Sequence, residues 1–195
     1  IGGDKRIIIA LNKAVDLSLK NVPIFEGKTL IAIDVSGSMS GKPAEIASLF
    51  GAVLAKANDS SDLLLFDTST TFKVINPMDS TLTIAKSLRF NGGGTDFHCI
   101  FKGLKKAYDR IVILSDMQGW VGYDTPTKTF NEYKSKFNCK PFIYSFDLQS
   151  YGTTQFPEDK VFCLYGFSDK IFEIMSMFEQ DKDALIQDIE NSVYL

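Results

Sequence analysis

The chain alternates short apolar runs with amphipathic stretches, and the two patterns predict different elements. Uninterrupted runs such as Leu30–Ile33 are typical of strands buried on both faces of a sheet. Stretches with apolar residues three or four positions apart predict helices. The expected strands cover residues 30–33, 62–66, 71–75, 111–116, 140–147 and 161–164, and the expected helices residues 5–20, 43–57, 80–88, 97–108, 126–137, 169–177 and 183–192.

Strands that alternate with helices along the chain predict an α/β, Rossmann-like fold. The sheet is expected to be doubly wound and mainly parallel, with helices on both of its faces. Residues 67–70 form a link so short that 62–66 and 71–75 are expected to pair as a hairpin. That hairpin gives the sheet one antiparallel edge strand, a common addition to parallel sheets.

Length and composition fit one globular domain. A chain of 195 residues is long enough for an α/β domain with a full core, and 45% hydrophobic residues is a globular value. We expect a single domain over residues 1–195, in which 1–27 form a lead-in helix and connector and 28–195 form the core. Because the chain begins with Ile1 rather than Met, we expect it to be a fragment of a longer protein.

The charge balance weighs against direct binding of nucleic acid. The net charge is −3 and the sequence pI is about 5.2, so phosphate binding would need a local basic patch. Basic residues cluster mildly at Lys102, Lys105 and Lys106. We interpret these three lysines as the solvated face of a helix.

The sequence also bears on the cellular compartment. No apolar run approaches the length needed to cross a membrane, and no signal peptide is visible. The three cysteines, Cys99, Cys139 and Cys163, lack the spacing of zinc or redox motifs, so we expect reduced, buried thiols. These features predict a cytoplasmic protein without a membrane partner.

Oxygen-bearing side chains follow two of the expected buried strands and one glycine-rich loop. Asp34, Ser36 and Ser38 come directly after the first buried strand, Thr95 follows three glycines, and Asp116 ends a later buried strand. In open α/β sheets, ligands bind in the crevice outside the carboxyl ends of the strands. Carboxylate and hydroxyl oxygens without His or Cys suit a hard divalent cation.

In order along the chain, these residues form the pattern D-x-S-x-S, then T-D, then D. The pattern resembles the metal-ion-dependent adhesion site of von Willebrand factor A (vWA) domains. The resemblance implies that the hydroxyls of Ser36, Ser38 and Thr95 bind Mg²⁺ or Mn²⁺ directly. It also implies that Asp34 and Asp116 lie around the metal and act largely through water.

The wider sequence narrows the kind of vWA domain. The segments GKTLIAIDVSGSM, GGGTD and ILSDMQ, together with a lead-in helix that ends in Asn-Val-Pro, resemble the carboxyl-terminal vWA domain of Ro-type (TROVE) proteins. In that family a separate ring of helical repeats holds noncoding RNA. The resemblance therefore implies that RNA is bound by another module of the parent protein, while this domain offers its metal to partner proteins.

We interpret the metal as a means of binding rather than of catalysis, so the protein is not expected to be an enzyme. Hydroxyls and water-bridged carboxylates neutralise Mg²⁺ incompletely and leave a position for an acidic residue of a partner protein. A hydrolytic metal would need a positioned base, and His98, the only histidine, is interpreted as a packed or surface residue.

Two alternatives remain open. The first is a metal-dependent phosphate-processing enzyme, although haloacid-dehalogenase-type phosphatases carry an acid/base Asp where this chain has Ser36. The second is a vestigial site in a scaffold that binds no metal.

The segment 117–123 beside Asp116 also has two open interpretations. Trp120 and Tyr123 form the aromatic rim of a partner site, or the loop folds back to cover the core.

Overall fold

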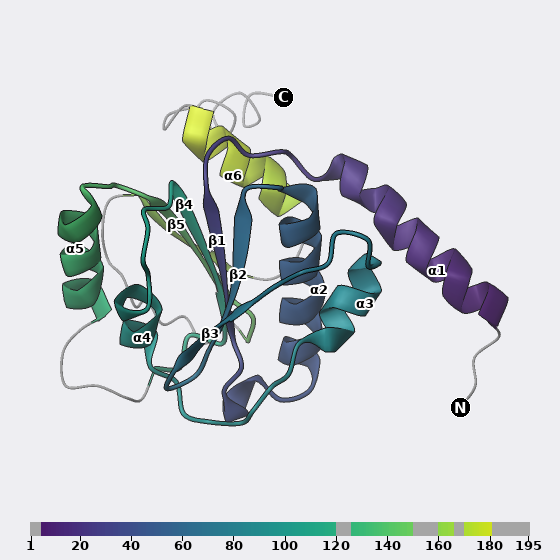
Figure 1. Cartoon of the computed structure of the whole chain (residues 1–195), viewed down its shortest axis with the longest axis horizontal. Helices are drawn as coiled ribbons and strands as arrows, with labels where there is room; N and C mark the ends of the chain where they lie inside the picture. Colours follow the sequence, from purple (N-terminus) through teal and green to yellow (C-terminus); the bar gives the residue numbers. More distant parts are fainter. Residues whose placement is uncertain (1–4, 120–125, 150–159, 166–169, 181–195) are drawn as a thin grey trace, which may run out of the picture.

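The computed structural model describes residues 5–119, 126–149, 160–165 and 170–180, and its helices surround a six-stranded sheet (Figure 1). The strands are β1 (Thr29–Asp34), β2 (Ser61–Phe66), β3 (Thr70–Lys73), β4 (Arg110–Ser115), β5 (Phe142–Asp147) and β6 (Val161–Tyr165). The α-helices are α1 (Lys5–Ser18), α2 (Lys42–Ala57), α3 (Thr81–Ser87), α4 (Phe97–Lys102), α5 (Pro126–Phe137) and α6 (Lys170–Gln180), and two 3₁₀ turns are η1 (Leu19–Asn21) and η2 (Gly37–Met39).

The strand order is β3-β2-β1-β4-β5-β6. All neighbours run parallel except β2 and β3, whose antiparallel register places Leu64 opposite Phe72. The chain first winds outward from β1 to β2 and β3, and then returns to place β4 on the other side of β1. This confirms the doubly wound, mainly parallel fold with one antiparallel edge strand. The carboxyl ends of β1 and β4 therefore lie side by side in the middle of the sheet, along the edge at which the parallel strands end.

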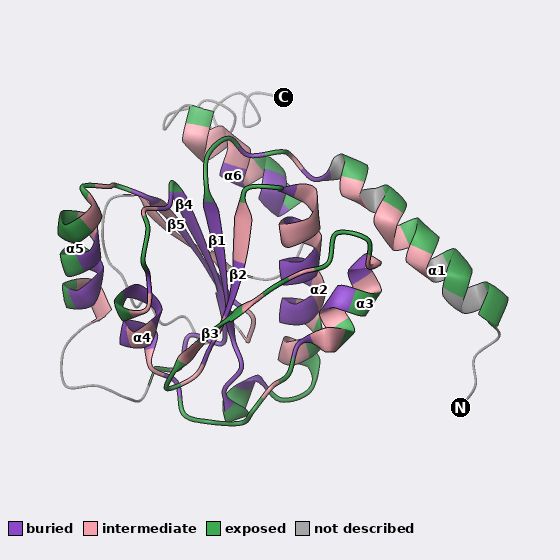
Figure 2. Ribbon diagram, in the orientation of Figure 1, coloured by how far each residue is buried: buried purple, intermediate pink, exposed green. Residues whose placement is uncertain are grey.

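Helices cover both faces of the sheet (Figures 1 and 2). Leu30 and Ala32 of β1 belong to the core beneath α4 and α5, whereas Ile31 and Ile33 belong to the core beneath α2 and α6. A Cβ added to Gly51 of α2 would lie 2.5 Å from Ile33 Cδ1. Helix α2 thus packs directly against β1, and this contact holds the turn that joins them.

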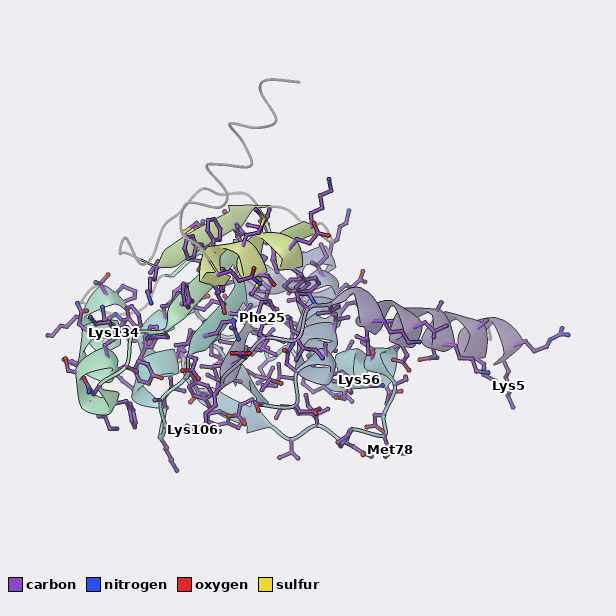
Figure 3. All side chains as sticks on the ribbon, turned by 90° about the horizontal axis from the view of Figure 1, so that it is seen from above. Lys5, Phe25, Lys56, Met78, Lys106 and Lys134 are labelled. Carbon is purple, nitrogen blue, oxygen red and sulfur yellow. The ribbon has the colours of Figure 1, made fainter. Side chains whose placement is uncertain are left out.

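Helix α1 projects from this body, with Lys5 at its far end (Figures 1 and 3). Its carboxyl-terminal part is tied down through Asp16, whose Oδ1 accepts hydrogen bonds from Thr81 N (3.0 Å), Thr81 Oγ1 (2.6 Å) and Lys56 Nζ (3.3 Å). The expected lead-in helix is therefore present and is attached at one end to α2 and α3.

A buried arginine lies at the amino end of β4. Arg110 is 2% exposed and forms an ion pair with Glu179 of α6. Its Nη1 donates to Thr29 Oγ1 (2.7 Å), and its guanidinium lies 4.2 Å from the centre of the Phe25 ring. The Tyr144 hydroxyl donates to Glu179 Oε1 (3.1 Å). This network anchors α6 to the sheet.

The expected helix over residues 97–108 is wrong in its extent, because α4 ends at Lys102 and Gly103 follows as its carboxyl-terminal cap. The chain then turns, and Tyr108 N donates to the Tyr133 hydroxyl (2.9 Å). Lys105 and Lys106 are exposed but do not lie on a helix face, and Lys106 forms an ion pair with Asp62 (2.6 Å).

Cys99, Cys139 and Cys163 form no disulfide, as expected, but they are half-buried rather than buried. Burial, together with the negative charges of Asp96 and Asp67, raises the pKa of the Cys99 thiol to about 12. Within the described ranges, no helix combines the length and apolar character that crossing a membrane requires. The helix expected over 183–192 lies outside the described residues.

Candidate metal centre

Two carboxylates are buried where the central strands end. Asp34 is the last residue of β1, and Asp116 directly follows β4. Because β1 and β4 are parallel neighbours, their ends bring both residues to one edge of the sheet. Both side chains are 0% exposed.

Asp34 receives hydrogen bonds from neutral groups. Its Oδ1 accepts from Ser36 N (2.9 Å) and its Oδ2 accepts from Ser115 Oγ (2.6 Å). Burial raises the pKa of Asp34, the bonds from Ser115 and Ser36 act to lower it, and the charge of Asp116 acts to raise it. The pKa of Asp34 is raised on balance, because burial disfavours the charged form of a carboxylate that has no countercharge among the described residues.

The D-x-S-x-S segment forms a tight turn that pairs its two hydroxyls. Ser36 Oγ and Ser38 Oγ lie 3.2 Å apart, with Ser36 buried and Ser38 exposed. Between Ser38 and α2, the Met39 side chain is 0% exposed and anchors the turn in the core. The two hydroxyl oxygens therefore lie in a row that leads from the buried Asp34 carboxylate to the solvent-exposed Ser38.

The glycine-rich loop packs against this turn through its backbone. Gly37 N donates to Gly93 O (2.9 Å), and Gly92 N donates to Val35 O (3.2 Å). A Cβ on Gly37 would lie only 3.2 Å from Gly92 O, so a larger residue there would press on the loop. Thr95, at the end of this loop, is buried.

Asp96 begins α4, where its Oδ1 accepts from His98 N (2.9 Å). His98 itself is buried, and its Nδ1 lies 3.1 Å from Thr129 Oγ1 of α5. The histidine of α4 thus packs against α5, which is the first of the two expected positions, packed or surface.

The third loop is joined to the first by a residue that the sequence did not reveal. Asp116 Oδ1 accepts from Gln118 N (3.2 Å), and its Oδ2 lies 3.4 Å from Gln149 Nε2. The same Gln149 nitrogen donates to Ser38 O (3.0 Å).

Sequence reasoning therefore missed two residues of this edge, Ser115 and Gln149. Ser115 had a partial signal, because it directly precedes Asp116 in an expected buried strand, but its contact with Asp34 depends on the register that the structure shows, in which Ile33 pairs with Leu114. Gln149 had none, since a glutamine after a strand is an ordinary loop residue.

The five predicted site residues, Asp34, Ser36, Ser38, Thr95 and Asp116, all lie on loops at this one edge. Their oxygens are of the kind that Mg²⁺ accepts, and among the described residues every hydrogen bond to the two carboxylates comes from an uncharged donor. Across the described part of the chain, no three His, Cys, Asp or Glu side chains cluster as a metal cage. A metal here would therefore depend on hydroxyls. Trp120 and Tyr123 lie outside the described residues.

Comparison with known proteins extends this description. The family model for the Ro60 vWA domain matches residues 28–179. The RNA-binding protein RO60 of Deinococcus radiodurans is 29% identical over 153 residues, which are 70% of this chain and 28% of that protein. The crystal structure of the Ro (Rsr) protein of D. radiodurans matches with a TM-score of 0.73 and 21% identity over 89% of this chain and 38% of that one.

A more distant match is the crystal structure of an aerotolerance-related membrane protein from Bacteroides fragilis. Its TM-score is 0.52 with 12% identity, over 77% of this chain and 96% of that one. At such identities the structural matches show the fold alone. The chain spans 28% of the length of the curated RO60 relative. The family model, in contrast, matches most of the chain and confirms the resemblance seen in its motifs. The protein therefore belongs to the Ro60 vWA-domain family.

Proposed function

We propose that this domain binds Mg²⁺ or Mn²⁺ through Asp34, Ser36, Ser38, Thr95 and Asp116, and that the metal holds an acidic residue of a partner protein. The observation that carries the proposal is the burial of two carboxylates at one end of the sheet, where all their hydrogen-bond donors in the described part of the chain are uncharged. Burial without a countercharge is unfavourable, and a divalent cation would relieve it.

The chemistry of the ligand set favours adhesion over hydrolysis. Three of the five proposed ligands are neutral hydroxyls, so the metal would keep part of its charge and attract a further anion. Hydrolysis would also need a base beside the metal, and the only histidine packs between α4 and α5 through Thr129. We therefore propose a protein-interaction domain rather than a phosphate-processing enzyme.

The neighbouring surface supports an acidic partner. A hollow of about 230 Å³ reaches Val35, the residue after Asp34, and is lined by Lys73 and Arg89 together with one carboxylate, Asp67. Among the described residues, neither of these cations has a recorded hydrogen bond or ion pair. A partner whose carboxylate binds the metal would find the charges of Lys73 and Arg89, offset in part by Asp67, in this hollow.

The family suggests the setting of this domain. The D. radiodurans relative is an RNA-binding protein, and this chain spans little more than a quarter of its length. We propose that the chain is the carboxyl-terminal module of a Ro-like, cytoplasmic protein that handles noncoding RNA. In this proposal RNA binds to the rest of the parent, in keeping with the net charge of −3 on this chain.

Calorimetric titration with Mg²⁺ and Mn²⁺ after chelator treatment tests the metal site. We expect one saturable site per chain. Its affinity for the metal should fall about 100-fold or more in Asp34→Asn, which loses the charge of the ligand, and in Thr95→Val, which loses the ligand oxygen. Asp59→Asn and Thr83→Val, whose side chains are exposed and lie away from the three loops, are the matched controls and should bind as the wild type does. Normal binding by both site variants would show that the metal binds elsewhere.

A second measurement tests the role of the metal. Acetate added to the Mn²⁺-loaded domain should displace metal-bound water and lower the water-proton relaxation rate. A phosphatase assay on the same sample should show no turnover. Turnover that disappears in Asp34→Asn would favour the enzymatic alternative instead.

A further inference from the structure

We propose that Gln149 is a positioning residue of this metal site, which holds two of its loops in the geometry that binds the metal. The inference rests on the proposed function, because it assigns a role toward the same metal. It adds a residue that lies outside the D-x-S-x-S, T and D pattern. Gln149 comes two residues after the end of β5, a strand that supplies none of the proposed ligands.

The backbone around Gln149 is fixed to the sheet. Gln149 N donates to Asp147 Oδ1 (3.1 Å), and Leu148 N donates to Ser115 O (2.9 Å). Asp147 is the last residue of β5 and is buried, and it pairs with Ser115 in the parallel register of β4 and β5. The side chain of Gln149 therefore starts from a well-defined point beside the end of β4.

From this point, one amide nitrogen contacts both halves of the proposed site. Gln149 Nε2 lies 3.0 Å from Ser38 O, in the loop after β1, and 3.4 Å from Asp116 Oδ2, in the loop after β4. An amide group carries two N–H donors, so it can serve both acceptors at once. The first contact is a good hydrogen bond and the second is a long one.

Each contact constrains a proposed ligand that has little other support. Ser38 is exposed, and the only side-chain contact recorded for its hydroxyl is Ser36 Oγ at 3.2 Å. The bond from Gln149 to the Ser38 carbonyl fixes the backbone that carries this hydroxyl. The contact with Asp116 Oδ2 orients a carboxylate whose other recorded bond reaches only Oδ1, from Gln118 N.

Uncharged donors behind metal-binding carboxylates are known to matter for affinity, because they fix ligand orientation without competing for the charge. Gln149 fits that role, since it donates to the ligand loops and carries no charge of its own. A role in stability alone would predict no effect on metal affinity, so the two roles can be separated by experiment.

The test compares Gln149→Leu, Gln149→Glu and the wild type by calorimetric titration with Mn²⁺ and by thermal unfolding in chelator. Gln149→Leu keeps the bulk of the side chain and removes both donors, so we expect Mn²⁺ affinity to fall about 10–100-fold. The unfolding temperature in chelator should change little. Gln180→Leu is the matched control, because this exposed glutamine ends α6 next to Glu179, at the opposite end of the strands from the proposed site, and it should bind as the wild type does.

Gln149→Glu gives the opposite signature. A carboxylate beside Asp116 repels it, so the unfolding temperature in chelator should fall, and Mn²⁺ should raise that temperature by more than it does in the wild type. If Gln149→Leu and Gln149→Glu both bind Mn²⁺ like the wild type, the inference is overturned while the proposed function stands. If the wild type itself binds no metal, the proposed function and the inference both fail.

Discussion

The two ends of the central strands bury charge in opposite ways. At the amino end, Arg110 is paired with Glu179, bonded to Thr29 and stacked near Phe25, and Tyr144 completes the network. At the carboxyl end, the buried carboxylates Asp34 and Asp116 accept hydrogen bonds from uncharged donors alone within the described ranges. The first arrangement satisfies its charges within the chain, whereas the second leaves negative charge for a group from outside.

The difference separates a structural role from a binding role. A buried charge with its partner in place is stable as it stands, and removing the partner is strongly destabilising. A buried carboxylate without a countercharge has a raised pKa, as burial gives Asp34, and becomes more stable when a cation arrives. The amino end should therefore respond to mutation, and the carboxyl end should respond to metal.

The largest expected effect is at the amino end. Glu179→Ala leaves Arg110 buried without its carboxylate, so the free energy of unfolding should fall by about 3–5 kcal/mol in urea titrations. Glu173→Ala, on the exposed face of the same helix, should change it by less than about 0.5 kcal/mol. Equal effects of the two variants would mean that the ion pair contributes nothing beyond the helix itself.

The next largest effect is the stabilisation of the fold by Mg²⁺ at the carboxyl end of the strands. Mg²⁺ at 100 times its dissociation constant should raise the free energy of unfolding by about 2.7 kcal/mol, since the ion binds only the folded chain. Thermal unfolding with and without the ion, at constant ionic strength, measures this shift. Asp34→Asn should show no such rise. A rise of the same size in that variant would contradict metal binding at the carboxyl end, because the stabilisation would then come from another site.

A smaller effect is expected from Ser115→Ala. This change removes the donor to Asp34 Oδ2 and the acceptor of Met117 N (2.9 Å), which is left buried without that bond. The free energy of unfolding should fall by about 1–2 kcal/mol, and Mg²⁺ affinity should fall with it. Ser145→Ala is the control, because this buried serine of β5 contacts only the weak acceptor Met117 Sδ (3.4 Å) among its recorded partners and should lose less.

The smallest effect concerns pH. Burial acts to raise the pKa of Asp62, but hydrogen bonds from Lys106 and Tyr108 and the charge of Lys106 lower it on balance from its ordinary value of 3.8. A lowered pKa stabilises the fold above that ordinary value, and the contribution is lost as pH falls through the lowered pKa.

Asp62→Asn should therefore reduce stability at pH 7 by less than about 1 kcal/mol, because the pair is exposed and screened. The difference from the wild type should vanish in acid. Urea titrations at both pH values measure it, and a difference that persists at the lowest pH would contradict the assignment.

The sheet was predictable from the sequence because its signals are local. The run Leu30–Ile33 and the short link at 67–70 depend only on neighbours in the chain, and both led to the observed strands and hairpin. The positions of the three loops that carry the proposed ligands were predictable from local sequence too, since the ligands in each loop come directly after a recognisable strand or a glycine run.

Other features depend on contacts between distant parts of the chain. The bonds of Gln149 span 111 and 33 positions, and the Arg110–Glu179 pair spans 69, so no local pattern points to them. The early end of α4 was missed for a related reason. The apolar residues at 104 and 108 continue the helical spacing, but they enter the core from a turn that begins at Gly103.

The order of the strands along the chain also determines the order in which the parts of the proposed site are synthesised. The turn after β1 is made early in the chain, yet Asp116 and Gln149 reach it only after β2, β3, α3 and α4 have been laid down and β4 and β5 have inserted on the far side of β1. A growing chain that has not yet supplied β4 has the hydroxyl half of the proposed site without its second carboxylate. In the proposed function, capture of an ion would thus mark the moment at which β1, β4 and β5 have come together, independently of β6 and α6, which follow later in the chain.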